Sequence, residues 1–401
     1  MLFEIPMFII LTVLSVYIIY LYYFALVSFI FRHTNFEKKR KSISTFNKFA
    51  LIIPAHNEEL LIGECLDSAF KIEYPKTKYD VIVIADNCDD STADIARGAG
   101  AICYERIDDS LRGKPFALNW IFTQIPLNVY DAYVIIDADT VIDKKFLWAM
   151  NTEINAGYKV IQGYFGISNP DESWITRLMV IPGILKYRYR YVGKKAMGLS
   201  CPLMGNGMCF SREVIERYGW DALTLTENWE YYVKLLLRGY YSTYCDEAYI
   251  YSQTAKTLKQ GKVQRKRWLK GRLQVISQYF PALVAEFLKK GNVKAIDCCV
   301  ELTLPSISML FNYAAILFFS TVMINFAHEL DTVYSCWAIF LMFVMFAYFC
   351  LGIASSKSPL KTLRALLKAP IFLGWKLVIS ITSLCSLTEN RWVKTDRHLS
   401  S

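Results

Sequence analysis

The sequence has few histidines and lacks cysteines paired at metal-binding spacing. Its 11 cysteines include no CxxC pair, and its four histidines are scattered, at His33, His56, His328 and His398. Structural zinc sites need closely spaced ligands, and a cysteine inside an apolar run behaves as a small hydrophobic residue. The sequence therefore argues against a zinc site and a disulfide framework, and it favours a reducing compartment.

Three common catalytic motifs are also absent. The sequence contains no Walker A loop, no GxGxxG and no GxSxG. The first two bring backbone N–H groups close to phosphates, and the third presents a nucleophilic serine. Their absence argues against phosphate-loop nucleotidases, dinucleotide-dependent oxidoreductases and serine hydrolases.

Acidic residues are outnumbered by basic ones, which gives a formal net charge of +9. Two basic clusters, Arg32–Lys48 and Lys256–Arg272, account for much of this charge, and the second contains no acidic residue. Basic clusters attract nucleic acids, anionic lipids and other polyanions. Because both clusters lie beside apolar segments, we expect the inner leaflet of a lipid bilayer as their partner, and no nucleic acid.

The apolar residues gather at the two ends of the chain. Met7–Phe31, Leu302–Phe326 and Thr332–Ser355 are uncharged runs, each longer than the ~20 residues that a membrane-spanning helix needs. The first has no basic start and no small-residue cleavage site, so a spanning helix is expected rather than a signal peptide. Basic residues follow it, which predicts a multi-pass protein of the inner (plasma) membrane with a cytoplasmic catalytic domain.

A fourth apolar stretch, Ala369–Thr388, contains Pro370 and Lys376. If it spanned the membrane, the basic tail would lie outside, so we favour a re-entrant or interfacial helix, with a fourth span as the alternative. The expected organisation is a transmembrane helix at 1–32, an α/β domain at 48–253, basic interfacial helices at 254–298, a transmembrane hairpin at 299–356, and an interfacial or fourth membrane segment with a basic tail at 357–401.

The middle of the chain alternates between short β-like runs and segments with helical spacing. Strands are expected at Phe49–Pro54, Tyr79–Ala85, Ala101–Glu105 and Tyr133–Asp137, and helices at Asn57–Phe70, Ser91–Arg97 and Lys114–Thr123. This alternation predicts a mostly parallel sheet covered on both faces. Ligands bind beyond the carboxyl ends of such strands, where His56-Asn57-Glu58, Asp86-Asn87 and Asp137-Ala138-Asp139 lie.

Asp137 and Asp139 are the first candidates for chemistry. Two carboxylates one residue apart can hold Mg²⁺ or Mn²⁺ together with diphosphate oxygens, although Asp is also common in ordinary turns. Arg112-Gly113-Lys114 suits a phosphate-contacting loop or a solvated basic turn.

Two later segments allow two interpretations each. Thr226 can act as N-cap of a helix that runs to Arg238, and acids in its first turn either favour the helix dipole or supply a general base. Gln264-Arg265-Lys266-Arg267-Trp268 is either a membrane-surface basic helix or part of a binding site.

Taken in order, these segments resemble the membrane-embedded family 2 glycosyltransferases, the group of the cellulose, chitin and hyaluronan synthases. The resemblance covers roughly residues 48–275 and also includes Gly205-Asn-Gly-Met-Cys-Phe210. It implies a GT-A fold, a Rossmann-like and mostly parallel sheet, with transmembrane helices at both ends. It also implies an inverting transfer from a UDP-sugar with Mg²⁺ or Mn²⁺.

The resemblance also implies roles for single residues. The nucleotide-sugar site would comprise Ala55, Asn57, Glu58, Asp86, Asn87, Lys114 and Asp137, with Asp86 accepting a hydrogen bond from uracil. Asp139 would ligate the metal. Asn206 and Gly207 would form the floor on the acceptor side, and Gln264, Arg267 and Trp268 would close over the diphosphate and the acceptor sugar.

The chain departs from the family pattern at Asn228. The family motif is Thr-Glu-Asp with the aspartate as base, and an amide cannot take a proton near neutral pH. Glu227 or Glu230 then serves as base, the acceptor is activated otherwise, or the protein is inactive and retains only donor binding. An active enzyme with Glu227 as base is the favoured interpretation.

Three functions are therefore considered. The first is a synthase that extends a cell-surface polysaccharide, exopolysaccharide or lipid-linked saccharide. The second is a transferase of one hexosyl or N-acetylhexosaminyl residue to a glycolipid or lipid carrier, and the third is a non-catalytic subunit. Three or four apolar segments are few to line a channel for a polymer, so processive synthesis implies a homo-oligomer or a partner subunit.

Overall fold

The computed structural model describes residues 4–31, 45–328 and 331–384. The basic residues directly after the first apolar run, the turn residue Glu329 and the basic tail lie outside these ranges, as do the last residues of Ala369–Thr388. The charge arguments for topology therefore remain predictions.

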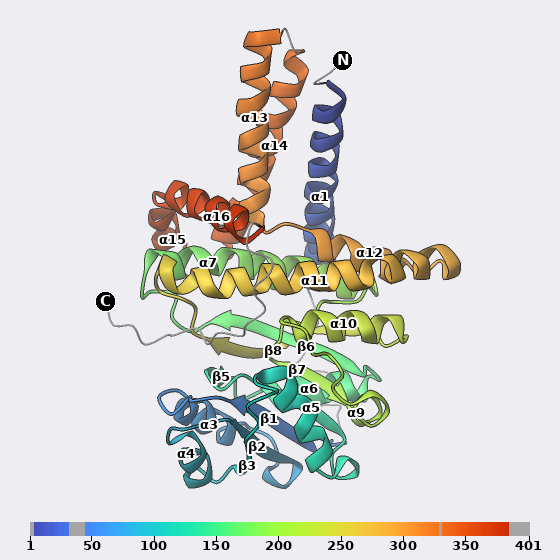
Figure 1. Cartoon of the computed structure of the whole chain (residues 1–401), viewed down its shortest axis with the longest axis vertical. Coiled ribbons are helices and arrows are strands. Elements are labelled where there is room, and N and C mark those ends of the chain that lie inside the picture. The colour runs from blue at the N-terminus through green and yellow to red at the C-terminus, as the bar shows by residue number, and fades with distance from the viewer. Residues whose placement is uncertain (1–3, 32–44, 329–330, 385–401) are drawn as a thin grey trace.

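One eight-stranded sheet forms the centre of the α/β domain (Figure 1). Its order is β3-β2-β1-β4-β7-β6-β8-β5, in which the first four strands are parallel and β7 is antiparallel to both β4 and β6. The eight strands are β1 Phe49–Ala55, β2 Tyr79–Asp86, β3 Ile102–Arg106, β4 Ala132–Ile135, β5 Thr140–Ile142, β6 Val160–Ile167, β7 Met208–Ser211 and β8 Ser242–Ser252. This is the GT-A architecture, so the predicted α/β fold class is confirmed.

Successive residues of β1 point to opposite faces of the sheet and enter two separate cores. Leu51 and Ile53 pack with helices α3, α4 and α6, whereas Ala50 and Ile52 pack with α5, α9 and α10. Both faces are therefore covered, as buried parallel strands require. These helices are α3 Ile62–Phe70, α4 Thr92–Gly98, α5 Lys114–Gln124, α6 Phe146–Asn155, α9 Arg212–Tyr218 and α10 Glu227–Leu237.

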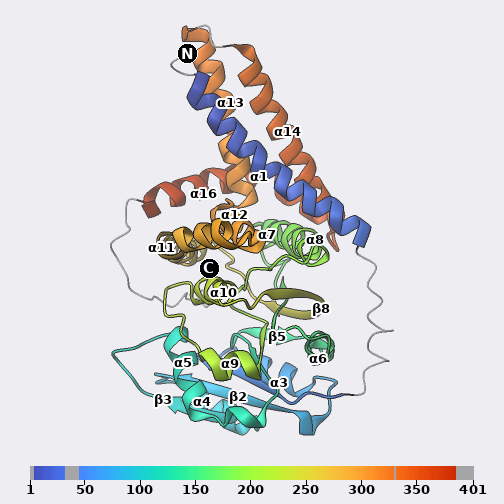
Figure 2. The same ribbon diagram turned by 90° about the vertical axis from the view of Figure 1, so that its right-hand side faces the viewer.

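Three helices rise away from the sheet domain in Figures 1 and 2: α1 Glu4–Phe31, α13 Ile307–His328 and α14 Thr332–Ala354. By length and composition all three could cross a membrane, and the bent pair α15 Pro359–Leu366 and α16 from Ala369 could form a fourth span. Their outer faces expose large apolar side chains such as Ile19 and Phe326. The predicted apolar segments therefore form helices that are long and apolar enough to span a membrane, and the 64° bend before α16 is compatible with the re-entrant or interfacial interpretation.

A layer of helices separates the spanning bundle from the sheet (Figure 2). It comprises α7 Trp174–Ile184, the π-helix η3 Leu185–Tyr191, α8 Val192–Ala196, α11 Leu258–Lys290, α12 Val293–Thr303 and α16 Ala369–Leu384. Gly193 lets α8 approach α1 closely, because a Cβ there would lie 2.3 Å from the Phe24 carbonyl oxygen. The helical layer is thus packed directly against α1.

Buried charges stabilise this contact between α1 and the helical layer, which we call the membrane joint. The Lys194 ammonium is fully buried and lies 2.7 Å from Asp297 Oδ2 and 3.1 Å from Glu301 Oε1. Tyr20 of α1 donates to Asp297 Oδ1 at 2.8 Å, and Arg190 Nε lies 3.4 Å from Glu301. A buried ion pair loses stability when one partner is removed, so α1 is held by polar contacts as well as by apolar packing.

One local expectation was wrong, and a second is confirmed in position only. The helix expected from Asn57 begins only at Ile62, because Asn57 adopts a left-handed backbone conformation with φ 53° that no helix tolerates. Thr226 occupies the N-cap position of α10, but its side chain makes no capping hydrogen bond.

Candidate active site

The turn after β4 holds Asp137 and Asp139, and Asn206 fixes its shape. The fully buried Asn206 amide accepts from the Asp137 backbone N–H at 3.1 Å and donates to Thr140 Oγ1 at 2.8 Å and to Ser252 Oγ at 3.1 Å. Asn206 was predicted on the acceptor side, yet these contacts make it the clamp of the two-aspartate turn. Its neighbour Gly207 has φ 64°, and a Cβ there would meet Ile250 at 2.7 Å.

Lys114, the first residue of α5, connects three segments that are far apart in the sequence. Its ammonium pairs with the Asp137 carboxylate and donates to the Gly205 carbonyl. It also lies 3.9 Å from Glu227 Oε1. The structure therefore brings together the predicted donor residues Lys114 and Asp137 and the predicted base Glu227.

Glu227 is the first residue of α10 and is 9% exposed. Burial raises the pKa of its carboxyl above the usual range, Lys114 acts in the opposite direction, and the negative charge of Asp137 adds to the rise. A buried carboxylate with a raised pKa beside a lysine ammonium has the properties of a general base.

Glu230 lies one turn further along α10, and its carboxylate is fully engaged. Oε2 accepts from the backbone N–H groups of Leu223 and Thr224 at 2.8 Å each, and Oε1 accepts from Tyr279 at 2.9 Å and pairs with Lys234 at 2.9 Å. Burial alone would raise the pKa of Glu230, but these donors lower it. The geometry thus favours Glu227 over Glu230 as the base.

Asn228 faces the loop before β7. Its amide donates to the Leu203 carbonyl at 2.6 Å, and a Cβ on Gly205 would lie 3.6 Å from Asn228 Cγ. Asn228 therefore braces the loop whose carbonyl receives Lys114. This is a structural role that needs no proton transfer.

Helix α11 carries the segment Gln264–Trp268, and one face of this helix lies against the same region. Gln264, Arg267 and Gly271 recur at helical spacing, and a Cβ on Gly271 would clash with Thr226 at 2.5 Å. Thr226 directly precedes Glu227, and the charge of Arg267 acts on the Glu227 carboxyl. Trp268 is 47% exposed, as an aromatic platform for a ligand would be.

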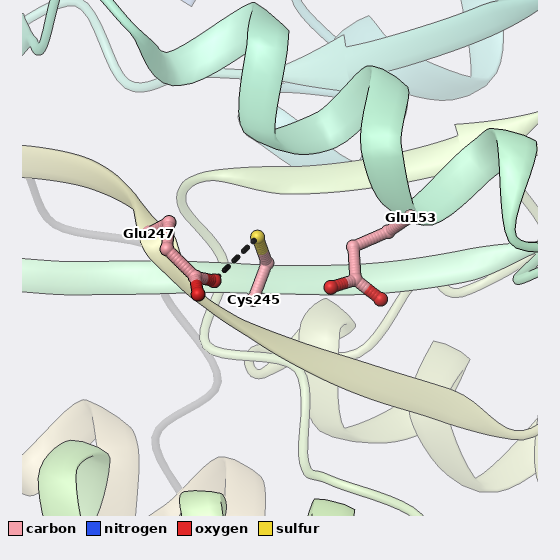
Figure 3. Close-up of side chains that lie close together, drawn as sticks. All are labelled: Glu153, Cys245 and Glu247. Atoms are coloured by element: carbon pink, nitrogen blue, oxygen red, sulfur yellow. Dashed lines mark hydrogen bonds between the residues drawn. The ribbon is translucent and has the colours of Figure 1, made fainter. Parts of the chain in front are cut away.

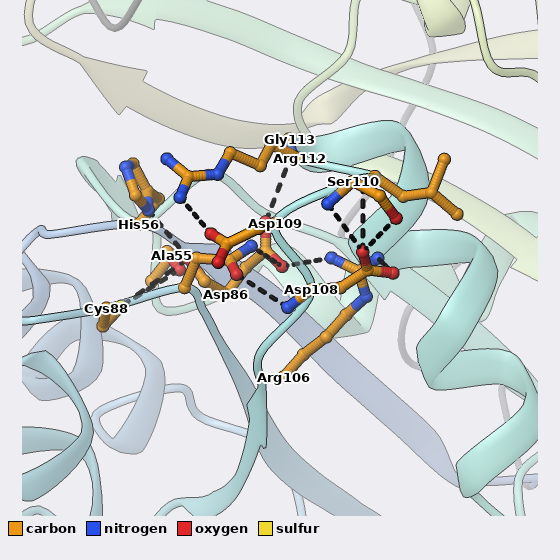
Figure 4. Close-up of polar contacts among 12 residues, drawn as sticks. Ala55, His56, Asp86, Cys88, Arg106, Asp108, Asp109, Ser110, Arg112 and Gly113 are labelled. Carbon is orange, nitrogen blue, oxygen red and sulfur yellow. Dashed lines mark hydrogen bonds and ion pairs between the residues drawn. The ribbon is translucent and has the colours of Figure 1, made fainter.

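The residues predicted to bind the nucleotide lie at the carboxyl ends of β1 and β2 (Figure 4). The Asp86 carboxylate is 3% exposed; it accepts from Arg106 Nη1 at 2.6 Å and Asn87 Nδ2 at 3.1 Å, and from the Gly113 backbone N–H at 3.3 Å. His56 Nδ1 lies 2.8 Å from the Asp86 carbonyl oxygen.

The remaining predicted nucleotide residues line the same end. The Ala55 carbonyl accepts from Cys88 Sγ at 3.5 Å, and the Glu58 backbone N–H donates to Thr92 Oγ1 at 2.8 Å. Asn57 and Asp89 exchange two hydrogen bonds. The loops after β1 and β2 are therefore tied together at the carboxyl edge of the sheet.

A cleft of about 530 Å³ opens beside Asp139. Asp137 and Asp139 supply carboxylate oxygens, the ligand type that Mg²⁺ and Mn²⁺ prefer, so the donor set fits the expected ion. The residues that line the cleft are Glu64, Asp139, Val141, Ser168, Asn169, Pro170, Asp171, Glu172 and Gln253.

A second group of possible metal ligands, Glu153, Cys245 and Glu247, lies on α6 and β8 (Figure 3). Lys195 Nζ lies 2.6 Å from Glu153 Oε1 and already supplies a cation. Burial raises the pKa of the Cys245 thiol well above its usual range, whereas a metal needs a thiolate. We assign this group to the domain core.

Arg106 is the main site residue that the sequence interpretation missed. It ends β3, pairs with Asp86, and also lies 2.8 Å from Asp108. The available signal was a charged residue at the end of the third parallel strand, at the same sheet edge as the predicted site. No motif contains it, because it lies 20 residues from its partner.

The comparisons with known proteins agree with this geometry. The family model described as "Glycosyltransferase like family 2" matches residues 47–271. The chain is 27% identical over 298 residues to the probable glycosyltransferase YdaM of Bacillus subtilis (strain 168), covering 70% of this chain and 69% of that protein.

Two more distant relatives have more specific names. A beta-monoglucosyldiacylglycerol synthase of Trichormus variabilis is 23% identical over 273 residues, covering 66% of this chain and 57% of that protein. A poly-beta-1,6-N-acetyl-D-glucosamine synthase of Staphylococcus aureus (strain COL) is 24% identical over 293 residues, covering 72% of this chain and 68% of that protein.

Proposed function

The chain belongs to the glycosyltransferases of family 2, and from this premise we propose that it transfers a sugar, with inversion, from a UDP-sugar to a growing cell-surface glycan. The observation that carries the proposal is the contact set of Lys114. This residue joins the Asp137 carboxylate, the Gly205 carbonyl and Glu227 in one site.

The proposed step is a single displacement at the anomeric carbon. Glu227 takes the proton of the acceptor hydroxyl as the new O–C1 bond forms. The C1–O bond to the diphosphate breaks on the opposite face, and its electron pair stays on the leaving phosphate oxygen. A positioned base contributes roughly 10²–10⁴-fold to such a step.

Three groups would counter the charge that develops on the diphosphate. Lys114 and Arg267 both act on the region around Glu227, and Asp137 and Asp139 would hold Mg²⁺ or Mn²⁺. When bound, this ion neutralises phosphate charge as a Lewis acid. Asn206 keeps the aspartates in place through its three hydrogen bonds.

The active site would face the cytoplasm of the inner (plasma) membrane. The layer formed by α7, α11 and α16 lies between it and the candidate spanning helices (Figure 1). Three or four spans are few for a glycan channel, so extension of a polymer would need further copies of this chain or a partner subunit.

The second candidate is the addition of a single sugar to a glycolipid or lipid carrier. The name of the monoglucosyldiacylglycerol synthase relative supports it, as the name of the poly-N-acetylglucosamine synthase supports the polymer. A non-catalytic subunit, the third interpretation, would bind donor without turnover.

One assay separates all three interpretations. The purified full chain is supplied with Mg²⁺ or Mn²⁺, membrane lipids and a panel of UDP-sugars, and both UDP release and product size are measured. A ladder of products supports the polymer, and a single added sugar supports the lipid acceptor. UDP release that is lost in Asp139→Ala supports catalysis. No turnover with any donor would refute the enzyme.

A further inference from the structure

A second group of charged residues lies at the foot of the spanning helices, away from the sheet. Lys376 on α16 is 8% exposed. Its ammonium donates to Ser306 Oγ at 3.1 Å and to Ser308 Oγ at 2.6 Å. These hydroxyls are neutral and flank the first residue of α13, so the buried charge has no counter-charge among its hydrogen-bond partners.

Arg265 on α11 brings a second cation to α16. Its guanidinium packs over the rings of Phe372 and Trp375, 5.6 and 5.3 Å from their centroids. Its Nη2 lies 2.9 Å from Met179 Sδ. Among the described residues, Arg265 likewise forms no ion pair with a carboxylate.

Lys186 on η3 is a third cation of this region. The charges of Arg265 and Lys186 both act against the charge on Lys376. Burial and the charge of Arg190 lower the pKa of Lys186 to about 7, while the charge of Glu301 acts in the opposite direction. Lys376 and Arg265 lie close together, because both pack against the ring of Phe372, 5.4 and 5.6 Å from its centroid.

Two buried acids of α12, Asp297 and Glu301, pair with other groups. In the described part of this joint, Glu301 pairs with Arg190 and Lys194, and Asp297 pairs with Lys194 and Tyr20. A buried charge without a partner is strongly unfavourable. A group of cations such as this one therefore fits a bound anion that supplies the missing charge.

Position identifies the source of the anion. Ser306 and Ser308 lie where α13 enters the candidate membrane region, and α16 lies across the foot of α13 in Figures 1 and 2. This is the depth of lipid headgroups, where phosphate is the abundant anion. Arg and Lys are the side chains that bind phosphate most strongly.

We propose that Lys376 and Arg265 bind the phosphate group of an anionic membrane phospholipid. The site is separate from the catalytic one, because Arg265 lies about 120° around α11 from the face of Gly271. It does not rest on the proposed function, since lipid binding is measured without a sugar donor.

The test measures thermal unfolding of the purified full chain in detergent, with phosphatidylglycerol, phosphatidylcholine or inorganic phosphate added. Phosphatidylglycerol should raise the Tm of the wild type, and the other two should not. Lys376→Met should abolish this shift, and Arg265→Gln should weaken apparent lipid affinity roughly tenfold, the usual effect of losing one charged hydrogen bond. Lys262→Gln, an exposed charge on the same helix, should behave as wild type.

The lipid-free protein gives an internal check. Because Lys376→Met removes a buried charge without a counter-ion, its Tm without lipid should equal or exceed that of the wild type. If this variant does not fold, the half-buried Arg265→Gln carries the comparison. Equal phosphatidylglycerol shifts in all variants would overturn the site, and an equal shift with inorganic phosphate would overturn the lipid as its source.

Discussion

Replacement of Glu227 by Gln tests the proposed base most directly. The amide keeps the shape of the side chain but cannot accept a proton. With saturating donor, kcat should fall roughly 10²–10⁴-fold, which corresponds to about 3–5 kcal/mol of activation free energy. The rate should be measured as UDP release across pH. The wild-type rate should rise as Glu227 ionises, at a pH above the usual range of glutamate, because burial raises its pKa.

As pH rises, the stability of the wild type should fall while its rate increases. A carboxyl with a raised pKa in the folded state binds its proton more tightly there, so wild-type stability falls as pH rises through that pKa. Glu227→Gln lacks this loss and should unfold at the same or a higher temperature than the wild type at neutral pH. A lower rate with an unchanged or higher Tm therefore distinguishes a catalytic loss from misfolding.

Glu230→Gln is the matched control. The pKa of Glu230 is lowered by its donors, so its stabilisation is present above the unfolded pKa and is lost as pH falls through the folded one. This variant should lower stability by about 1.5–3 kcal/mol near neutral pH and keep the rising pH profile. If Glu227→Gln kept more than half of the wild-type rate with an unchanged profile, the assignment of the base would be wrong.

Three further variants test the frame around the site. Asn206→Ala removes three hydrogen bonds from the two-aspartate turn and should weaken Mn²⁺ affinity roughly 10–100-fold in a metal titration of UDP release; unchanged affinity would contradict the clamp. Arg106→Met leaves Asp86 buried without its ion pair and should destabilise the fold by about 3–5 kcal/mol, seen as a lower Tm that UDP partly restores; a wild-type Tm would contradict it. Gly271→Leu pushes α11 from Thr226 and should lower kcat more than donor affinity, whereas unchanged kcat would separate this contact from catalysis.

The sequence alone predicts the first half of the sheet well. β1 to β3 begin and end within a residue or two of their expected limits, because alternating buried runs with short connections leave few other arrangements. The helix from Asn57 was placed five residues too early, since no local pattern shows the left-handed turn that Asn57 makes with Asp89. Such a turn depends on a neighbouring loop that is distant in the sequence.

The sequence predicts which residues belong to the candidate site, but it does not predict the contacts between them. Lys114, Asp137 and Glu227 were each named from motifs, yet only folding shows that one ammonium contacts both carboxylates. The commitment of Glu230 to Tyr279 was hidden because its partner lies 49 residues away on α11. Pairings between distant segments depend on the order of strands β4 to β8, which the sequence pattern does not specify.

The contacts of α1 have a consequence for the order of assembly. This helix is synthesised before its partners Gly193 and Asp297, which leave the ribosome long afterwards. Domains generally fold as units during synthesis, the N-terminal one first, so the sheet domain should fold while α1 waits in the bilayer with Tyr20 still lacking its acidic partners. Packing of α1 against α8 and α12 is then the last step of biogenesis. In a chain that stops before α12, α1 would lack these partners and would be recognised by cellular quality control.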